Sequence, residues 1–405
     1  MSRQSPFVLA GAAILFVATG ILAVRPLVPP VSSTDFDGFW EGGRAVLEGR
    51  DIYENPAHED SVSGSAVRRY LPFFSVAMAP LAALPLPVAG AVWHAVAFAS
   101  LWGCLRLSLQ WTGREVEFGS NAFLVVTAAA GVFCLDHFAR GQVALPVLFL
   151  ALAGLYVAER GKSFLGGALI ALAAALKVTP AIFVLYFLLK RRWMAAAGLV
   201  AGFALLCALT VPVFGPGRAF DLHKRWLLDY GMTAGAGFFE KRESMRFNNA
   251  SLPAVLARIL MEDVNAGRNK GPFYVNVAAL SPAAVAGIAR VIQFAALGAL
   301  GLLAFARRPG EPLRLSEIGF VLGITALFTP IAWTFHFVCL VPAFAALWCS
   351  GDRISRRWFW AAVALELTLL HPMPRALGGV LLADLAATVG VARLAWKERR
   401  TPAQD

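Results

Sequence analysis

The chain has 405 residues, of which 58% are hydrophobic and only 15% are charged, against roughly 25% charged in a soluble domain. A water-soluble fold of this length could not bury so much apolar surface, so the composition excludes one and indicates a multi-pass membrane protein. The net charge of +11 is carried by short basic clusters between apolar segments. This distribution is typical of the positive-inside rule, so membrane lipids are expected partners and nucleic acid is not.

The apolar segments predict an all-α polytopic fold with about twelve membrane-embedded helices in one integral membrane domain, residues 1–405. They cover residues 7–27, 88–109, 118–137, 142–158, 163–178, 180–190, 193–213, 283–306, 315–330, 336–350, 357–371 and 375–395. The first is interpreted as a retained helix because no small-residue cleavage site follows it. Twelve spans place both termini and the basic clusters on the cytoplasmic side of a bacterial inner membrane.

Two long connections, residues 29–87 and 214–282, are predicted on the extracytoplasmic side, each with an amphipathic helix. In the first, Thr34 fits a helix N-cap, and Asp35 and Asp37 follow it. Apolar residues then recur at helical spacing: Phe36, Phe39, Trp40, Val46 and Leu47. The pattern predicts a helix lying on the membrane with its positive end at Asp35. Both acids could simply complement the helix dipole, which is the preferred interpretation for Asp37.

Several predicted spans are shorter than the roughly 20 residues that cross a bilayer, and Pro180, Pro330 and Pro372 lie near their outer ends. Unwound backbone at membrane depth is tolerated only where it is buried in protein or lines a cavity. We therefore expect a polar cavity that opens to the extracytoplasmic side.

The sequence contains no pattern that predicts a metal site, a disulfide framework or a nucleotide cofactor. The five cysteines are an odd number without a C-x-x-C pair, which argues against a disulfide framework and a zinc site. There is no P-loop, no dinucleotide-binding glycine fingerprint and no histidine pair at helical spacing. A lone Asp35-x-Asp37 is too short and too common to predict a metal. No metal and no cofactor are expected.

Six short stretches carry a resemblance to a known family. They are Asp35 to Tyr53, Tyr70-Leu71-Pro72, Gly141-Gln142, Lys177-Val178-Thr179-Pro180, Asn249-x-Ser251-Leu252 and Thr329 to His336. In order and spacing, from about residue 30 to 350, they resemble the polyprenyl-phosphate-mannose-dependent mannosyltransferases, glycosyltransferase family 87. The chain departs from the family pattern at Leu71, Ala144 and Phe335, where a proline, an asparagine and a histidine would stand.

The resemblance implies a GT-C architecture and transfer of a hexose, expected to be mannose. The donor would be a polyprenyl-phosphate sugar, and the acceptor a lipid-linked or cell-envelope glycan. It also assigns Asp35 as the catalytic base. A positioned carboxylate can accept the proton of an attacking hydroxyl, and a single direct displacement inverts the anomeric carbon.

The departing lipid phosphate needs positive charge or hydrogen-bond donors. Lys177, inside an apolar segment, is the best candidate, although it could instead snorkel to the interface. His336 is a second candidate, with an ordinary interfacial histidine as the alternative. The further candidate substrate-binding residues are Tyr70, His137, Arg140, Gln142, Asn249 and Trp333. Arg140 could instead form a structural ion pair with Asp136 four residues earlier.

Two other functions stay open at this point. Twelve spans and basic residues also suit a lipid or polar-solute transporter or flippase, although unequal loop lengths and the lack of an internal repeat disfavour it. A scaffold subunit of an envelope complex would need no polar cavity. The transferase hypothesis predicts that Asp35, Lys177 and His336 meet in one outward-facing chamber.

Overall fold

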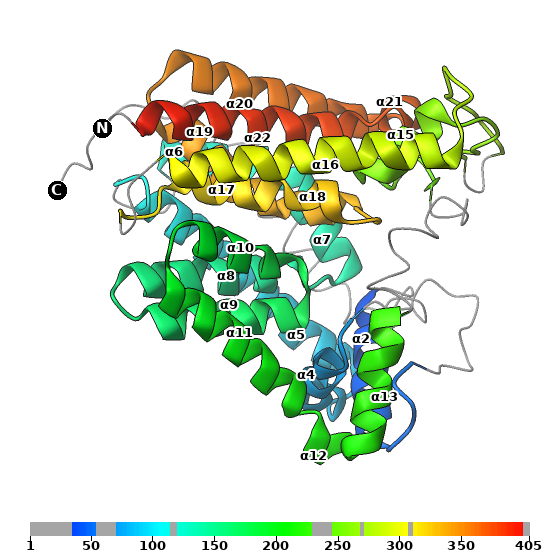
Figure 1. The fold of residues 1–405 in the computed structure, drawn as a ribbon. Helices are drawn as coiled ribbons and strands as arrows, with labels where there is room; N and C mark the ends of the chain where they lie inside the picture. The colour runs from blue at the N-terminus through cyan, green and yellow to red at the C-terminus, as the bar shows by residue number, and fades with distance from the viewer. Residues whose placement is uncertain are drawn as a thin grey trace.

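The computed structural model describes residues 35–53, 70–113, 120–228, 245–267, 271–306 and 311–399. All regular elements in these ranges are helices (Figure 1). In chain order they are α2 (Asp35–Leu47), α4 (Pro72–Ala82), α5 (Leu86–Gln110), α6 (Asn121–Ala129), α7 (Gly131–Arg140), α8 (Ala144–Glu159), α9 (Ser163–Leu176), the 3₁₀ helix η2 (Thr179–Ala181), α10 (Ile182–Leu189), α11 (Trp193–Ala208), α12 (Val211–Phe214), α13 (Pro216–Trp226), α15 (Leu252–Leu260), α16 (Pro282–Phe305), α17 (Leu315–Gly323), α18 (Thr325–Phe328), the 3₁₀ helix η5 (Thr334–Leu340), α19 (Val341–Cys349), α20 (Arg353–Glu366), the 3₁₀ helix η6 (Leu367–Leu370), α21 (Pro372–Ala376) and α22 (Gly379–Glu398).

Four stretches in the described part of the chain are long and apolar enough to cross a membrane: α5, α11 with α12, α16 and α22. The pair α6 and α7 could form a fifth span, bent by 59°. The remaining apolar helices are shorter, and the expected helix at 7–27 lies outside the described residues. A membrane protein is therefore confirmed, while the count of twelve spans stays a prediction.

Most predicted helices lie within a few residues of their expected positions, but several are interrupted. The segment expected at 118–137 bends at Ala130, between α6 and α7. The segment expected at 180–190 begins with the short 3₁₀ helix η2, which has Pro180 in its first turn. The segment expected at 336–350 is the 3₁₀ helix η5 followed by α19. Each interruption shortens a helix that the apolar pattern alone makes continuous.

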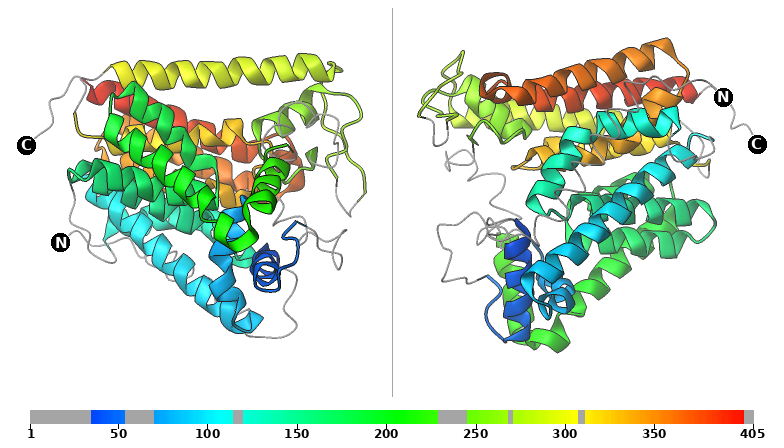
Figure 2. Two further views of the ribbon diagram at one scale, coloured as in Figure 1. Left: turned by 60° about the horizontal axis from the view of Figure 1, so that its bottom comes forward. Right: turned by 180° about the vertical axis from the view of Figure 1, so that it is seen from behind.

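The helices form two groups that meet around α7. In Figures 1 and 2, helices α16 to α22 lie side by side in one group, and α5 with α8 to α11 form the other. Within the first group α20 packs on α22, and α17 packs on α19 and α22. Within the second, α9 packs on both α8 and α11. Helix α7 contacts η5, so it connects the two groups through their irregular segments.

Close packing between α9 and α11 depends on two glycines. A Cβ atom at Gly167 would lie 2.0 Å from the carbonyl oxygen of Ala195, and one at Gly198 would lie 2.0 Å from that of Phe164. These obstacles are backbone atoms that no rotamer change can move. Small residues at such crossings let membrane helices approach closely, since van der Waals contact replaces the hydrophobic effect there.

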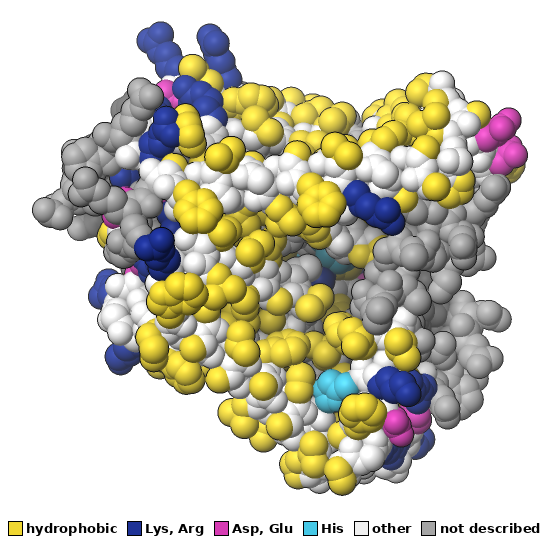
Figure 3. Space-filling model, viewed as in Figure 1, with side chains coloured by type: hydrophobic (Ala, Val, Ile, Leu, Met, Phe, Trp, Pro, Cys, Tyr) yellow, Lys and Arg dark blue, Asp and Glu magenta, His cyan; other side chains and the backbone are white. Residues whose placement is uncertain are grey.

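The outer surface fits a lipid environment. In Figure 3, hydrophobic side chains cover the middle of the visible face, and lysines and arginines gather toward its ends. On α16 the side chains of Val291, Phe294 and Phe305 are each 69% exposed. Such a row of exposed large apolar side chains is unfavourable in water and favourable in hydrocarbon.

Candidate active site

Helix α2 carries Asp35 as its first residue and is held by an aromatic cluster. Phe36 stacks on Trp93 with ring centroids 5.9 Å apart, and Phe39 meets Phe74 edge-on at 4.9 Å. The predicted helix is therefore present, and Phe36 and Phe39 of its apolar stripe are buried. Leu47, at the other end of the stripe, is exposed. The proposed cap Thr34 lies outside the described residues.

Gln142 brings the first loop motif and the glycine–glutamine motif together. Its Nε2 donates a hydrogen bond to Oδ2 of Asp35 at 2.6 Å, across 107 residues of sequence. Its Oε1 accepts from the hydroxyl of Tyr70 at 3.4 Å. The amide can face only this way, because an ionised carboxylate accepts hydrogen bonds and cannot donate them. Three residues predicted from separate motifs thus share one partly buried hydrogen-bond network.

The turn before Gln142 fixes its position. Helix α7 ends at Gly141, whose backbone is left-handed with a φ of 62°. A Cβ atom there would lie 2.7 Å from Cβ of Phe36, so a side chain is excluded by both backbone conformation and contact. The indole nitrogen of Trp93 donates to the Gly141 carbonyl at 2.8 Å. This turn therefore presents Gln142 to the first residue of α2.

Asp136 connects α7 to the segment that carries His336. Its Oδ1 pairs with Nε of Arg140 at 3.0 Å, and its Oδ2 accepts from the backbone N–H of Phe335 at 3.1 Å. Arg140 thus forms the structural ion pair that was the alternative to ligand binding. The pair orients a carboxylate that fixes the start of η5 on α7.

Lys177, Phe335 and His336 lie together. Lys177 stands at the C-cap of α9 in an extended conformation, and its Nζ lies 5.5 Å from the ring centroid of Phe335. The Phe335 ring stacks on the imidazole of His336 with centroids 4.4 Å apart. Phe335 stands where the family pattern has a histidine, so an apolar ring takes the position between the two polar candidates.

Two histidines differ in their surroundings. Nδ1 of His336 lies 3.0 Å from the backbone nitrogen of Trp333, from which it can accept, and 3.2 Å from the Trp333 carbonyl oxygen, to which it can donate. His137 is 1% exposed, and neither ring nitrogen has a hydrogen-bond partner among the described residues. It interacts electrostatically with Lys177 and His94. An unpartnered buried imidazole beside an ammonium is a donor that a phosphate oxygen could satisfy.

Asn249 uses its amide on the backbone. Its Nδ2 donates to the Pro330 carbonyl at 3.1 Å, and its Oδ1 accepts from the N–H groups of Ser251 at 3.0 Å and Ala332 at 2.9 Å. Asn249 therefore holds the loop before η5. The indole of the neighbouring candidate Trp333 packs against the main hydrophobic core. Substrate contact by either residue stays a prediction.

Arg375 was not predicted from the sequence as a site residue. This half-buried residue on α21 donates from Nη2 to the hydroxyl of Thr334 at 3.3 Å, and its guanidinium lies 5.2 Å from the ring centroid of Phe247. It also interacts electrostatically with Asp136 and Arg140. The available signal was an arginine among prolines, His371 to Arg375, at the end of an apolar segment.

Contacts that run through α7 connect Asp35, Lys177 and His336. Asp35 is held just after the carboxyl end of this helix, and Asp136 on the helix holds the segment that stacks against Lys177. A shared chamber is compatible with these contacts and stays a prediction. Among the described residues no group of three histidines, cysteines or acids could hold a metal ion.

Comparison with known proteins gives the family. The model of glycosyltransferase family 87 matches residues 69–330, more than half of the chain. A Mycolicibacterium smegmatis protein named polyprenol-phosphate-mannose-dependent alpha-(1-2)-phosphatidylinositol pentamannoside mannosyltransferase is 28% identical over 80% of this chain and 73% of its own length. The Mycobacterium tuberculosis protein of the same name is 29% identical over 67% of this chain and 56% of its own length. A second M. smegmatis relative, a phosphatidylinositol mannoside mannosyltransferase, is 26% identical over 84% and 75%. No solved structure matches. The chain therefore belongs to glycosyltransferase family 87.

Proposed function

We propose that this glycosyltransferase moves mannose from a polyprenyl-phosphate carrier to a lipid-linked glycan. Family membership supports a transferase over a transporter or a scaffold. The names of the relatives support polyprenyl-phosphate mannose as donor and a mannosylated phosphatidylinositol as the class of acceptor. We further propose a GT-C arrangement in a bacterial inner membrane, with the reaction on the extracytoplasmic side.

Asp35 is the proposed general base. The observation that carries this assignment is the 2.6 Å hydrogen bond from Gln142, which orients the carboxylate at the start of α2. The family model begins at residue 69, so Asp35 itself lies before the matched range, whereas Gln142 lies inside it. The Gln142 amide is buried and held by Tyr70, and it donates to one oxygen of the Asp35 carboxylate. This contact fixes the orientation of the carboxylate, as proton transfer from a bound hydroxyl requires.

The proposed reaction is one displacement. The acceptor hydroxyl gives its proton to Asp35 as its oxygen bonds to the anomeric carbon. The bond between that carbon and the phosphate oxygen breaks, and the electron pair leaves with the polyprenyl phosphate. Attack from the face opposite the leaving group inverts the anomeric configuration.

The leaving phosphate gains negative charge, and cations and hydrogen-bond donors on the other side of α7 are proposed to stabilise it. Lys177 supplies an ammonium, His336 an imidazole and His137 a buried imidazole without a hydrogen-bond partner among the described residues. Donors fixed in place before the reaction stabilise developing charge without reorganisation.

Replacing Asp35 with asparagine tests the base. Asp35→Asn keeps the shape of the side chain but removes its capacity to accept a proton, and we expect turnover to fall at least ~100-fold. Asp37→Asn is the matched control, because it removes an acid from the same helical turn, and it should retain turnover within about threefold. The measurement is transfer of radiolabelled mannose from polyprenyl phosphate to envelope lipids by the purified protein. Near-normal transfer by Asp35→Asn would remove Asp35 as the base.

A further inference from the structure

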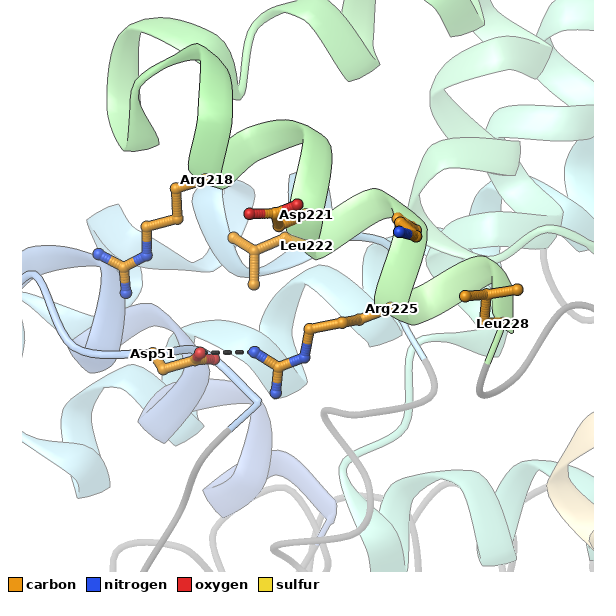
Figure 4. A pocket seen from close by; sticks show the side chains of 7 residues that line it. Asp51, Arg218, Asp221, Leu222, Arg225 and Leu228 are labelled. Atoms are coloured by element: carbon orange, nitrogen blue, oxygen red, sulfur yellow. Dashed lines mark hydrogen bonds and ion pairs between the residues drawn. The ribbon is translucent and has the colours of Figure 1, made fainter.

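A charged cavity lies at the far end of α2 from Asp35, between the loop after α2 and α13. Its volume is about 440 Å³, and it is lined by Asp51, Arg218, Asp221, Leu222, Lys224, Arg225 and Leu228. Figure 4 shows Arg218 and Arg225 reaching from α13 toward the Asp51 loop, with Asp221 between them. Three cationic and two anionic side chains thus share one small space.

Only one of the three cations in this cavity forms an ion pair with a lining acid among the described residues. Asp51 pairs with Arg225 at 2.6 Å. Burial alone would raise the pKa of Asp51, but hydrogen bonds from the Tyr53 N–H and Arg225 hold its pKa below the usual value. Arg218 donates to the Gly49 carbonyl at 3.1 Å, a neutral partner. Lys224 is exposed and makes no ion pair among the described residues. Outside the Asp51–Arg225 pair, the lining therefore holds Arg218, Lys224 and Asp221, which leaves a net charge of +1 for an anionic ligand.

The helix that carries these cations also carries exposed apolar side chains. Phe220 is 69% exposed and Leu227 is 48% exposed, seven residues apart and so near one face of the helical turn. A helix with basic residues on one side and large apolar residues on another lies at a membrane interface. In Figure 3, basic and acidic side chains gather together over α13 beside hydrophobic ones. A ligand of this cavity would come from the lipid headgroup layer.

The cavity is connected to the proposed base by a chain of hydrogen bonds. The backbone N–H of Tyr53 donates to Asp51 at 2.8 Å, and the Tyr53 hydroxyl donates to the Tyr70 carbonyl at 2.8 Å. Tyr70 in turn donates to Gln142, which holds Asp35. Helix α2, with 13 residues, separates the two ends by about 20 Å at ~1.5 Å per residue. The cavity is thus fixed relative to the base, at a distance that an extended glycan could span.

We propose that this cavity binds the phosphate-bearing polyol headgroup of the lipid acceptor. Arg218 and Lys224 hold the phosphate, and the Asp221 carboxylate accepts hydrogen bonds from ring hydroxyls. The glycan then extends along α2, with its terminal hydroxyl at Asp35. This inference rests on the proposed function for the role of the lipid as acceptor, but binding of the headgroup can be measured without turnover.

The test is binding by the full chain in phosphatidylcholine nanodiscs, with dihexanoyl phosphatidylinositol as the probe. Dihexanoyl phosphatidylglycerol, inositol phosphate and inorganic phosphate are the comparison ligands. We expect phosphatidylinositol to bind more tightly than the other three, and Lys224→Glu or Arg218→Gln to weaken it about tenfold or more, since each removes a charge-assisted contact. Asp221→Asn should narrow the preference for phosphatidylinositol over phosphatidylglycerol. Arg357→Gln, which removes an exposed charge on α20, is the control and should bind as the unmodified chain does.

The outcomes separate this site from the proposed function. If the unmodified chain binds phosphatidylinositol as expected but transfers no mannose, the proposed function is refuted and the headgroup site is still supported. Mannose transfer with unchanged phosphatidylinositol affinity in Lys224→Glu and Arg218→Gln would overturn the site. Tighter binding of inositol phosphate or inorganic phosphate than of the lipid would also overturn it. With transfer intact, Lys224→Glu should raise the KM for the lipid acceptor about tenfold and leave the KM for the donor unchanged.

Discussion

At the scale of single residues, the site is built by side chains that hold other side chains. Gln142 contacts Asp35 and Tyr70, Asp136 fixes the backbone at Phe335, and Asn249 fixes the loop before it. The motif residues near the proposed chemistry therefore divide into groups that could touch substrate and groups that position them. Gln142 is the clearest positioning residue, because it is 3% exposed and its amide is satisfied within the protein.

Gln142→Glu tests this positioning role. It would place a second carboxylate at hydrogen-bond distance from Asp35, and two neighbouring carboxylates compete for one proton. We expect the pH below which kcat/KM falls to move upward by about one unit or more. Gln142→Met, which removes the hydrogen bond to the ionised carboxylate without adding charge, should lower kcat and move that pH upward by a smaller amount than Gln142→Glu does. Identical pH profiles for all three proteins would contradict the positioning role.

At the scale of elements, broken helices bring polar groups of the proposed site together. The bend between α6 and α7, the 3₁₀ turn η2 and the 3₁₀ helix η5 all lie beside proposed site residues. Regular helices elsewhere support these segments by close packing. The closest approach is between α9 and α11, where glycines let the two backbones come together. Helix α9 ends at Lys177, so a displacement of α9 would also move that ammonium.

Gly167→Ala tests the contact between α9 and α11. The added Cβ would lie 2.0 Å from the Ala195 carbonyl oxygen, so the helices must separate. Overpacking of this kind costs about 1–3 kcal/mol, and the melting temperature in detergent should fall by several degrees. Gly298→Ala on α16 is the control, because a Cβ there meets no atom within 4 Å. Equal melting temperatures for the two variants would show that the crossing adapts freely.

At the scale of the whole molecule, a buried ion pair and several hydrogen bonds join the two groups of helices. Nζ of Lys190, after α10, lies 2.8 Å from Oε1 of Glu317 on α17, and both side chains are 3% exposed. The hydroxyl of Tyr186 donates to the other Glu317 oxygen at 2.9 Å. Arg192 pairs with Glu159, which also accepts from the backbone N–H of Leu313. Basic residues that fit the positive-inside pattern thus also connect distant segments.

Glu317→Ala tests this junction. Removal of one partner leaves the Lys190 ammonium buried and unpaired, which costs about 3–5 kcal/mol. We expect a large loss of thermal stability in detergent. The double variant Lys190→Met with Glu317→Leu removes both charges and fills the space, so it should recover most of that loss. A double variant as unstable as the single one would show that the pair contributes mainly through packing.

The sequence by itself determined that the protein lies in a membrane, to which family it belongs and where most of its helices lie. Apolar segments identify a membrane protein because hydrocarbon-facing helices need apolar side chains along their length, and the ordered motifs identify the family. It also located Asp35, Gln142 and Tyr70 as candidates. It did not show that they touch, since their contacts cross up to 107 residues, and periodicity records only local geometry.

The tertiary structure alone decided the bend before α7, the hydrogen bonds of Asn249 to the backbone, the place of Arg375 and the charged cavity on α13. Each of these depends on which distant segments pack together, and that depends on the shapes of surfaces formed only after the helices have assembled.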